Sequence, residues 1–375
     1  MKRTNLITSV FIGLLSTLLV TSCDENPEVT SSQDILPEVF RVDIPQAISN
    51  SLFVAGGKQA GRTKEDSLQG NEIYGNLNTF IALGESAAEV TEEIIIGLKK
   101  YKLDRVLTLS VVSDDDGRVK NLVVVADPEF EGQTWEYQLT VTDAESEGNA
   151  DGGKAMQIFW NKSRPFKGIA IIKLFNANRR ENPDAGEATV RIDYSEEGNL
   201  GYDAHMEVRV SGLPLPSPLE DPFAVNALRM FAGKKGDVVD VFGNSNHPNA
   251  ILLSGSTGFN WAFVASGSDA DDIGVAEVGL PPSNLDETDR TVLLKDFSIK
   301  NVFISEINAV WPGIDPVLVA GFLKNTEAPG FFSGKTGFIS AGTSPGLAWD
   351  VFADRINDLT PFNPLEVSNL VVTFK

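Results

Sequence analysis

Apolar and polar residues alternate along much of the chain beyond residue 105. Val190, Ile192 and Tyr194 alternate with Arg191 and Asp193, which is the period-two pattern of a strand with one buried face. Segments of this kind occur in pairs joined by short turns. The pattern therefore predicts antiparallel β-hairpins.

The first predicted hairpin joins residues 105–112 to residues 119–126 through a turn that ends in Asp116-Gly117, and an Asp-Gly step is a strong hairpin signal. The other predicted strands are 134–141, 154–160, 167–175, 188–194, 205–210, 226–232, 237–242, 260–266, 273–280 and the last nine residues, 367–375.

A different period occurs before the first hairpin. Between Asn71 and Tyr101 the apolar or small residues are three and four positions apart, which predicts an amphipathic helix that packs on a sheet, or a pair of helices broken near Gly84. Two shorter helices are predicted at 316–325 and 346–357. The predicted fold class is mainly β (β-rich α+β): a large hairpin-built antiparallel sheet, or a barrel-like half-barrel, with an N-terminal helical layer and a mixed C-terminal part.

Residues 46–375 are expected to form the folded domain. The proline-dense segment 212–222 is the place where this domain would divide, unless it is a long connection within one sheet.

The N-terminal 22 residues have a basic start (Lys2, Arg3) and an apolar run over residues 6–20 that threonine and serine interrupt. The run is shorter than the ~20 residues that a membrane-spanning helix needs. This composition predicts an export signal. It ends at Cys23, the only cysteine in the chain.

The sequence Val20-Thr21-Ser22-Cys23 resembles the lipobox of bacterial lipoproteins. The resemblance implies a signal peptide over 1–22, cleavage before Cys23 and lipidation of Cys23, so that the membrane is a partner through the lipid anchor. With Cys23 lipidated, residues 23–45 are expected to be a lipidated, flexible tether. The alternative is an ordinary secretory signal with a chance cysteine.

Acidic residues follow the cysteine directly, over residues 24–28. They resemble the signal that sends lipoproteins of the Bacteroidota type to the outer face of the outer membrane. The resemblance implies an outer-membrane, cell-surface location, with the periplasmic face as the alternative.

The formal net charge is −21, and removal of a signal peptide with Lys2 and Arg3 makes it more negative. Such a charge disfavours binding to nucleic acid and basic-patch docking on anionic lipid. With 42% hydrophobic residues the chain has enough apolar material for a large core.

Two motifs resemble catalytic loops, but one lacks the residues and the other lacks the glycine spacing that the reaction requires. In Gly342-Thr-Ser-Pro-Gly346, the residue after Ser344 is Pro345, which has no N–H for an oxyanion, and no histidine follows. We expect a helix start there, with Ser344 as the cap and Pro345 at the first position. In residues 330–336 the glycines are one position too close for a phosphate-binding loop, so a glycine-rich loop is expected.

Metal sites are also unsupported. The acidic clusters 114–116 and 269–274 lack ligands that a calcium loop requires and are expected to be solvated turns. His205 and His247 have no cysteine beside them, so the usual nitrogen and sulfur ligands of a zinc site are missing. We expect no metal, no cofactor and no catalytic residue.

Residues 242–250, Phe-Gly-Asn-Ser-Asn-His-Pro-Asn-Ala, are interpreted as the most polar loop of the chain. Its candidate ligand-binding residues are Asn244, Asn246 and His247. The alternative is a turn in which these side chains bond their own backbone.

The expected function is that of a lipid-anchored cell-envelope protein, a non-enzymatic binding or interaction module. One alternative is a carbohydrate-active enzyme or glycan-binding lipoprotein, because paired carboxylates and five tryptophans are available. The other is a carrier of lipid or another apolar ligand held in a curved sheet. The expected ligand is therefore a glycan, a lipid or a protein.

Overall fold

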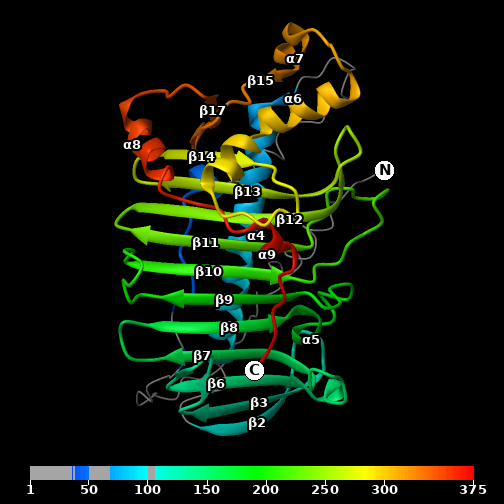
Figure 1. Ribbon diagram of the computed structural model, residues 1–375. Coiled ribbons are helices and arrows are strands. Elements are labelled where there is room, and N and C mark those ends of the chain that lie inside the picture. The colour runs from blue at the N-terminus through cyan, green and yellow to red at the C-terminus, as the bar shows by residue number, and fades with distance from the viewer. Residues whose placement is uncertain (1–35, 37–38, 50–67, 100–105) are drawn as a thin grey trace.

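Thirteen strands form one antiparallel open sheet in which nearly every strand pairs with its neighbour in the chain (Figure 1). The computed structural model describes residues 36, 39–49, 68–99 and 106–375. The predicted signal peptide, Cys23 and most of the predicted tether lie outside these residues. The predicted fold class, mainly β with hairpin-built antiparallel pairing, is confirmed, and the sheet is open.

The sheet is a meander because each hairpin turn is short. Its strands, in spatial order, are β17 (Gly337–Ala341), β16 (Gly330–Ser333), β14 (Ile273–Gly279), β13 (Thr257–Ser268), β12 (Val238–Ile251), β11 (Ala227–Lys235), β10 (Ala204–Ser211), β9 (Thr189–Ser195), β8 (Lys167–Lys173), β7 (Lys154–Asn161), β6 (Tyr137–Asp143), β3 (Val119–Ala126) and β2 (Leu107–Val112). The small strands β4 (Glu129–Phe130) and β5 (Gln133–Thr134) pair with each other, and β1 (Leu68–Gln69) pairs with β15 (Leu323–Lys324).

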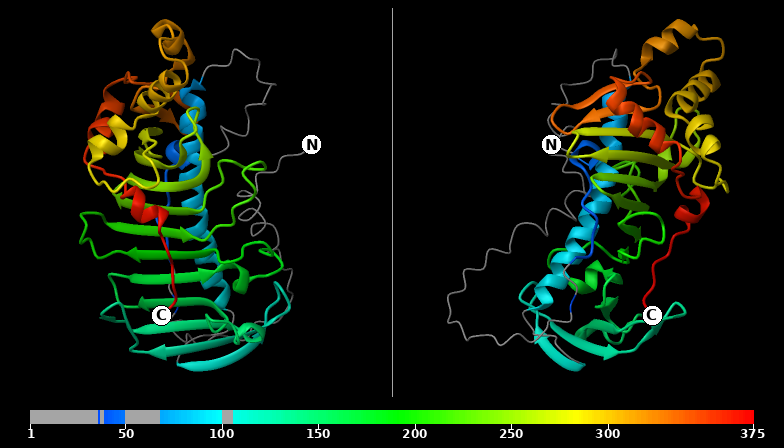
Figure 2. Two further views of the ribbon diagram at one scale, coloured as in Figure 1. Left: turned by 45° about the vertical axis from the view of Figure 1, so that its right-hand side comes forward. Right: turned by 90° about the vertical axis from the view of Figure 1, so that its left-hand side faces the viewer.

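The predicted helix is a single element, α4 (Gly70–Leu98), that runs across the strands on one face of the sheet (Figures 1 and 2). Its buried side includes Leu77, Ile81 and Ala88. The alternative of a helix pair broken near Gly84 is wrong. Gly84 lies where α4 crosses β11, and a Cβ there would overlap the thioether of Met230, so a small residue permits close packing.

The segment before α4 also belongs to the core. Phe40, Val42 and Ile44 are buried, and the backbone N–H of Phe40 donates to Glu92 Oε1 at 2.9 Å. The short helix α2 (Gln46–Ser49) follows. The expectation that the flexible tether extends to residue 45 is therefore wrong for residues 40–45, where alternate apolar side chains pack between α4 and the sheet.

Three C-terminal elements cover the other face of the sheet: the π-helical turn η4 (Thr291–Asp296), α8 (Leu347–Ile356) and α9 (Pro364–Ser368) (Figure 2). The helices α6 (Ile299–Val310) and α7 (Pro316–Phe322) lie beyond the β14 end of the sheet, where α7 packs on β15 and α6 buries Ile299 and Val302 in the core on the α4 side. The helices predicted at 316–325 and 346–357 are confirmed as α7 and α8. The principal hydrophobic core lies on the α4 side, and two smaller clusters lie under α8 and under the end of the chain.

Three predicted segments differ from the structure. The strand expected at 367–375 is wrong: α9 occupies its start, and residues 370–375 cross the sheet without a strand partner, with the N–H of Val372 donating to Ser211 Oγ at 3.1 Å. The loop expected at 330–336 contains β16. Helix α8 begins at Leu347 with Gly346 in the cap position, so Ser344 is not the cap; its hydroxyl accepts from the N–H of Gly346.

The proline-dense segment 212–222 connects β10 to β11, which pair along seven residues. It is therefore a connection within one sheet. Among the described residues, no helix combines the length and the apolar character that crossing a membrane requires.

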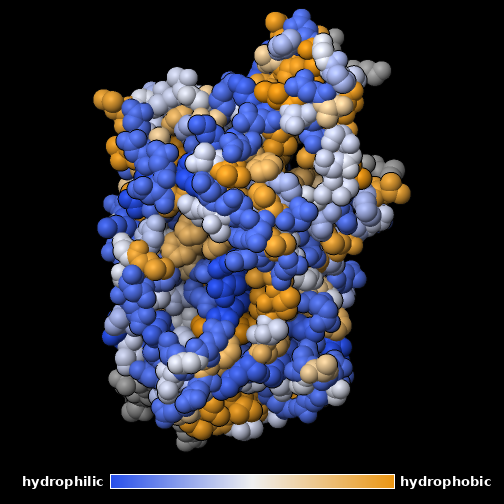
Figure 3. Space-filling model, viewed as in Figure 1, coloured by the Kyte–Doolittle hydropathy of each residue, from blue (hydrophilic) through white to orange (hydrophobic). Residues whose placement is uncertain are grey.

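Most of the surface in Figure 3 is hydrophilic, in keeping with the net charge of −21. Apolar side chains gather at its two ends, over α7 and near β2. Val317 and Leu318 are exposed at the first end, and Val106 and Val112 at the second. The β2 end of the sheet is thus open to solvent on its outer side, while its inner side faces α4.

Candidate functional site: a pocket between the end of α4 and the β2 end of the sheet

A cavity of ≈ 210 Å³ lies between the C-terminal turns of α4 and the inner face of strands β2, β3, β6 and β7. The side view in Figure 2 shows this end of the sheet bending toward the helix. The apolar wall consists of Val90, Ile94, Leu98, Val111, Leu122, Val141, Ala155, Met156, Leu174 and Ala177. Polar side chains line the remainder: Glu93, Ser113, Asp114, Asp115, Lys120, Asn178, Glu181 and Asn182.

Strand periodicity produces the apolar wall. Lys120, Leu122 and Val124 are buried on the α4 side of β3, whereas Val119 and Val123 point to solvent, because successive side chains of a strand face opposite ways. Val111, Leu122 and Val141 thus reach the same cavity from three neighbouring strands.

A β-bulge widens the set of residues that reach the cavity. Val141 pairs with Met156, but the next residue, Thr142, pairs with Lys154, so Ala155 has no partner opposite it. A bulge bends its strand and redirects side chains. Both Ala155 and Met156 consequently line the cavity.

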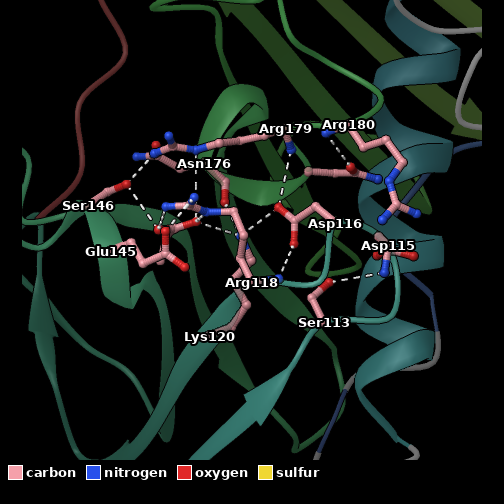
Figure 4. A network of polar contacts seen from close by, with 12 residues as sticks. Ser113, Asp115, Asp116, Arg118, Lys120, Glu145, Ser146, Asn176, Arg179 and Arg180 are labelled. Carbon is pink, nitrogen blue, oxygen red and sulfur yellow. Dashed lines mark hydrogen bonds and ion pairs between the residues drawn. The ribbon is translucent and has the colours of Figure 1, made fainter.

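A network of charged side chains closes the cavity on its polar side (Figure 4). Asp143, at the end of β6, is fully buried. Arg118 binds it with two hydrogen bonds, Nε to Oδ2 at 2.6 Å and Nη2 to Oδ1 at 2.7 Å. Lys120 Nζ donates to the same carboxylate at 2.9 Å, and Ser146 Oγ donates at 3.0 Å.

These bonds decide the protonation of Asp143. Burial alone would raise the pKa of this carboxyl, but the hydrogen bonds from Arg118 and Lys120 outweigh burial and hold the pKa well below its ordinary value. Asp143 is therefore ionised at neutral pH, and the network joins β3, β6 and the segment after β8.

The ammonium of Lys120 is fully used. It donates to Asp116 Oδ2 at 3.1 Å, to Asp143 Oδ2 at 2.9 Å and to the carbonyl oxygen of Asn176 at 2.8 Å, and an ammonium has three donors. A lysine whose three N–H donors are all engaged offers no free lone pair for nucleophilic attack. The network is consequently a structural one that positions the polar side of the cavity.

The third wall is the segment that follows α5 (Leu174–Ala177). Asn178 Oδ1 accepts from the N–H groups of Arg180 and Glu181, both at 3.1 Å, and the Asn178 carbonyl accepts from Asn182 Nδ2 at 3.1 Å. Asn182 is 3% exposed. Its Oδ1 is buried and accepts no hydrogen bond from the described residues.

The cavity rim is acidic. Glu93, Asp114, Asp115 and Glu181 supply four carboxylates. Burial, and after it the negative charges of Glu89 and Glu92, raise the pKa of Glu93. No group of three or more acidic, histidine or cysteine side chains in the described part of the chain is arranged to hold a metal ion.

The expected solvated turn at 114–116 is only partly correct. Asp114 and Asp115 are exposed within a turn, but Asp116 is buried against Lys120. Hydrogen bonds from the backbone and from Lys120 overcome the effect of burial and lower the pKa of Asp116. The acidic cluster thus serves the ion network and the rim at the same time.

The residues predicted for ligand binding do not form one site. Asn244, Asn246 and His247 lie in β12, so the loop expected at 242–250 is wrong: the polar side chains are part of the sheet. Asn244 and Asn246 bond the C-terminal segment on one face, whereas His247 contacts Phe80 of α4 on the other. Residues an odd number of positions apart in a strand point to opposite faces.

Each of the three has a structural partner. Asn244 Oδ1 accepts from the N–H of Phe362 at 2.8 Å, and Asn246 Oδ1 accepts from the hydroxyls of Ser283 and Ser368. His247 Nδ1 lies 2.8 Å from the carbonyl oxygen of Phe223, and burial lowers its pKa to about 4. These polar residues hold layers of the fold together.

Comparison with known proteins adds no relative: no family model, no curated protein and no solved structure matches this chain.

The sequence contains no motif that identifies this pocket. Its residues come from α4, four strands and the segment at 174–182, and no short motif joins them. The one local signal is the acidic turn at 114–116, for which the sequence predicts a solvated turn. The β-bulge at Ala155 and the burial of Asn182 depend on tertiary contacts, and neither has a sequence signature.

Proposed function

We propose that this protein is a lipid-anchored protein of the bacterial cell envelope that binds a small ligand in the pocket between α4 and the β2 end of the sheet. The observation that carries the binding role is the pocket itself, a concave, mostly apolar site with convergent polar groups, which is the usual form of a small-molecule site. The proposed location is the cell surface.

The anchor is supported by the N-terminal sequence. A lone cysteine in an exported protein has no partner for a disulfide, and lipidation removes its reactive thiol. Residue 36 and residues 39–49 are packed against α4 and the sheet, so about a dozen residues separate Cys23 from the folded body. At ~3.3 Å for each extended residue, that tether would hold the body within roughly 45 Å of the bilayer.

A binding role, rather than catalysis, is supported by the chemistry of the pocket. Its lysine is saturated by three acceptors, and its lining includes neither histidine nor cysteine. The serine in the lining, Ser113, has no histidine near it to act as a base. Apolar walls with acidic and amide groups provide recognition without an activated nucleophile.

The size of the pocket favours a small ligand over a lipid. Sites for drug-sized ligands range from about 300 to 1,000 Å³, and this cavity has ≈ 210 Å³. A two-chain lipid would need far more space. Glycan binding in this pocket has little support, because its lining contains no tryptophan. Trp135, Trp160 and Trp261 are buried in the core, and Trp311 is exposed but outside the lining.

The binding role is tested by blocking the pocket. Gly97 lines it, and a Cβ at this position meets no atom within 4 Å, so Gly97→Leu would extend an isobutyl group into the mouth from an unobstructed Cβ. Purified protein and this variant would be screened against a library of small metabolites by thermal shift. Compounds that stabilise the parent protein but not Gly97→Leu support the proposal. If every hit stabilises both equally, the pocket is not the binding site.

The anchor is tested separately with Cys23→Ser. We expect loss of metabolic labelling by palmitate and release of the protein from the membrane fraction. A variant that remains in that fraction at the parent level would overturn the anchor. Surface exposure is then measured by protease accessibility on intact cells.

A further inference from the structure

We propose that the ligand of the pocket is a small organic cation, an aliphatic primary amine whose ammonium group lies at the acidic rim and whose short carbon chain lies against the apolar wall. This inference rests on the proposed binding role of the pocket and names its ligand class. Three properties of the site carry it: the sign of the rim charge, an unpaired acceptor, and the apolar wall.

The rim charge is negative and is not neutralised by the lysine inside the pocket. The lining contains four carboxylates and one ammonium. That ammonium, of Lys120, is already matched by Asp116 and Asp143 outside the lining. The carboxylates of Glu93, Asp115 and Glu181 therefore attract a cation, and an apolar wall strengthens the attraction by lowering the local dielectric.

Other acidic side chains on α4 act in the same direction. Glu89 and Glu92 lie near Glu93 on the helix, and Arg41 bridges to both of them, at 3.6 and 3.0 Å. Burial, and after it the charges of Glu89 and Glu92, raise the pKa of Glu93 although Arg41 acts in the opposite direction. A bound ammonium would relieve that repulsion.

The second property is an acceptor without a donor. Asn182 is 3% exposed, its amide nitrogen donates to the Asn178 carbonyl, and its Oδ1 accepts nothing from the described residues. A buried, unsatisfied acceptor costs free energy. Asn182 lines the cavity, and a rotation of its amide toward the cavity would let a ligand N–H donate to this oxygen. An ammonium carries three donors.

The apolar wall separates an organic cation from a metal ion. Ten of the lining residues present hydrocarbon or thioether groups, which contribute nothing to a hydrated metal. The described residues also contain no metal-holding group of acidic side chains. The cavity volume of ≈ 210 Å³, below the range of drug-sized sites, limits the ligand to a short carbon chain, and a six-carbon amine is a suitable probe.

Three probes of one length and three charges test the ligand class: n-hexylamine, 1-hexanol and hexanoate. Each would be titrated by calorimetry at pH 7 into the mature chain with Cys23→Ser. We expect the amine to bind most tightly, the alcohol about tenfold more weakly and hexanoate not measurably. The preference for the amine over the alcohol should fall as salt is raised, because the rim charges are partly exposed.

Variants show how much each side chain contributes to binding. Glu181→Gln and Asp115→Asn should each lower the affinity for the amine about two- to fivefold and leave the affinity for the alcohol unchanged. Asn182→Leu should lower the affinity for the amine about tenfold. Arg180 lies beside the rim near Asp115 (Figure 4), and Arg180→Gln should raise the affinity for the amine. Asp184→Asn, exposed on the same segment but outside the lining, is the matched control.

The outcomes separate this inference from the proposed binding role. If the amine and the alcohol bind equally and Gly97→Leu abolishes both, the pocket binds ligands but the cation class is wrong. If the amine binds equally to the parent and to Gly97→Leu, or binds to neither, this inference is wrong; whether the pocket has another ligand is then decided by the metabolite screen.

Discussion

Arg118, the residue before β3, binds Asp143 at the end of β6 through two parallel hydrogen bonds of 2.6 and 2.7 Å, and the carboxylate is fully buried. A planar guanidinium matches a carboxylate with this geometry. Lys120 Nζ binds the same carboxylate at 2.9 Å. Two cations therefore depend on one buried anion, and the polar side of the pocket depends on all three residues.

Replacement of Asp143 by asparagine should lower the free energy of unfolding by about 3 kcal/mol, because two cations then lose their buried partner. The matched control is Glu145→Gln, since Glu145 contacts the same arginine from an exposed position and should contribute less than about 1 kcal/mol. Urea unfolding at pH 7 measures both. Equal losses for the two variants would contradict the role of Asp143.

The effect of Asp143 should also depend on pH. Its folded-state pKa is below the ordinary value of about 3.9 because of Arg118 and Lys120. The unfolded state then binds the proton more readily, so the stabilisation is complete above about pH 4 and declines as the pH falls further. The unfolding free energies of the parent protein and Asp143→Asn should converge in that acid range.

His247 should make the fold less stable between pH 6.5 and pH 4. Burial lowers its pKa to about 4, whereas an unfolded histidine titrates near 6.5. Below pH 6.5 protonation favours the unfolded state, and the loss approaches its limit near pH 4, on the order of 3 kcal/mol. His247→Gln keeps a polar group beside Ser245 and the Phe223 carbonyl but does not titrate in this range.

The measurement is the urea midpoint of both proteins across pH 4 to pH 7. The parent midpoint should fall more steeply than that of His247→Gln. Identical slopes would show that His247 does not titrate with a shifted pKa. His205, whose pKa is also lowered by burial, is present in both proteins and therefore does not affect the comparison.

Two glycines of α4 should respond oppositely to the same substitution. Gly84→Leu should destabilise by about 1–3 kcal/mol, since its side chain overlaps Met230 on β11. Gly97→Leu meets open space and should gain up to about 0.7 kcal/mol from helix propensity. Thermal and urea unfolding provide the comparison. A Gly84→Leu protein as stable as the parent would mean that α4 does not pack closely on β11.

Asn246 should hold the C-terminal layer on the sheet. It is 3% exposed, and its Oδ1 accepts from Ser283 and Ser368. Asn246→Ala leaves the Ser283 hydroxyl without this acceptor and should cost about 1–3 kcal/mol, whereas the Ser368 hydroxyl keeps the carbonyl oxygens of Ser283 and Pro364 at 2.8 Å. Hydrogen exchange should show faster exchange at residues 362–369. Asn249→Ala, at a half-buried position of the same strand, is the control, with an expected change within about 0.5 kcal/mol.

The alternation of apolar residues and the turn residues between them specify most of the strands. Val190, Ile192 and Tyr194 occupy the buried side of β9 as predicted, and the Asp-Gly turn joins β2 to β3. Short turns permit only adjacent antiparallel pairing, so the sequence by itself determines a hairpin-built sheet, one long amphipathic helix and the resemblance of its N-terminus to a lipoprotein signal.

Local pattern was misleading where side chains have unusual tertiary partners. Asn244, Asn246 and His247 resemble turn residues, yet they lie in the middle of the sheet because Phe362, Ser283, Ser368 and Phe223 supply their hydrogen-bond partners. The alternating residues at 370–375 resemble a strand, yet they cross the sheet because their apolar side chains pack on it instead of joining its edge.

Only the tertiary structure decided where the candidate site lies. Bending of the sheet end toward α4 brings Glu93, Leu122 and Asn182 to one cavity, although they are distant in the chain. Which face of a strand is covered, and by what, depends on the packing of whole layers. Local periodicity carries no information about that packing, and the pocket therefore had no signature in the sequence.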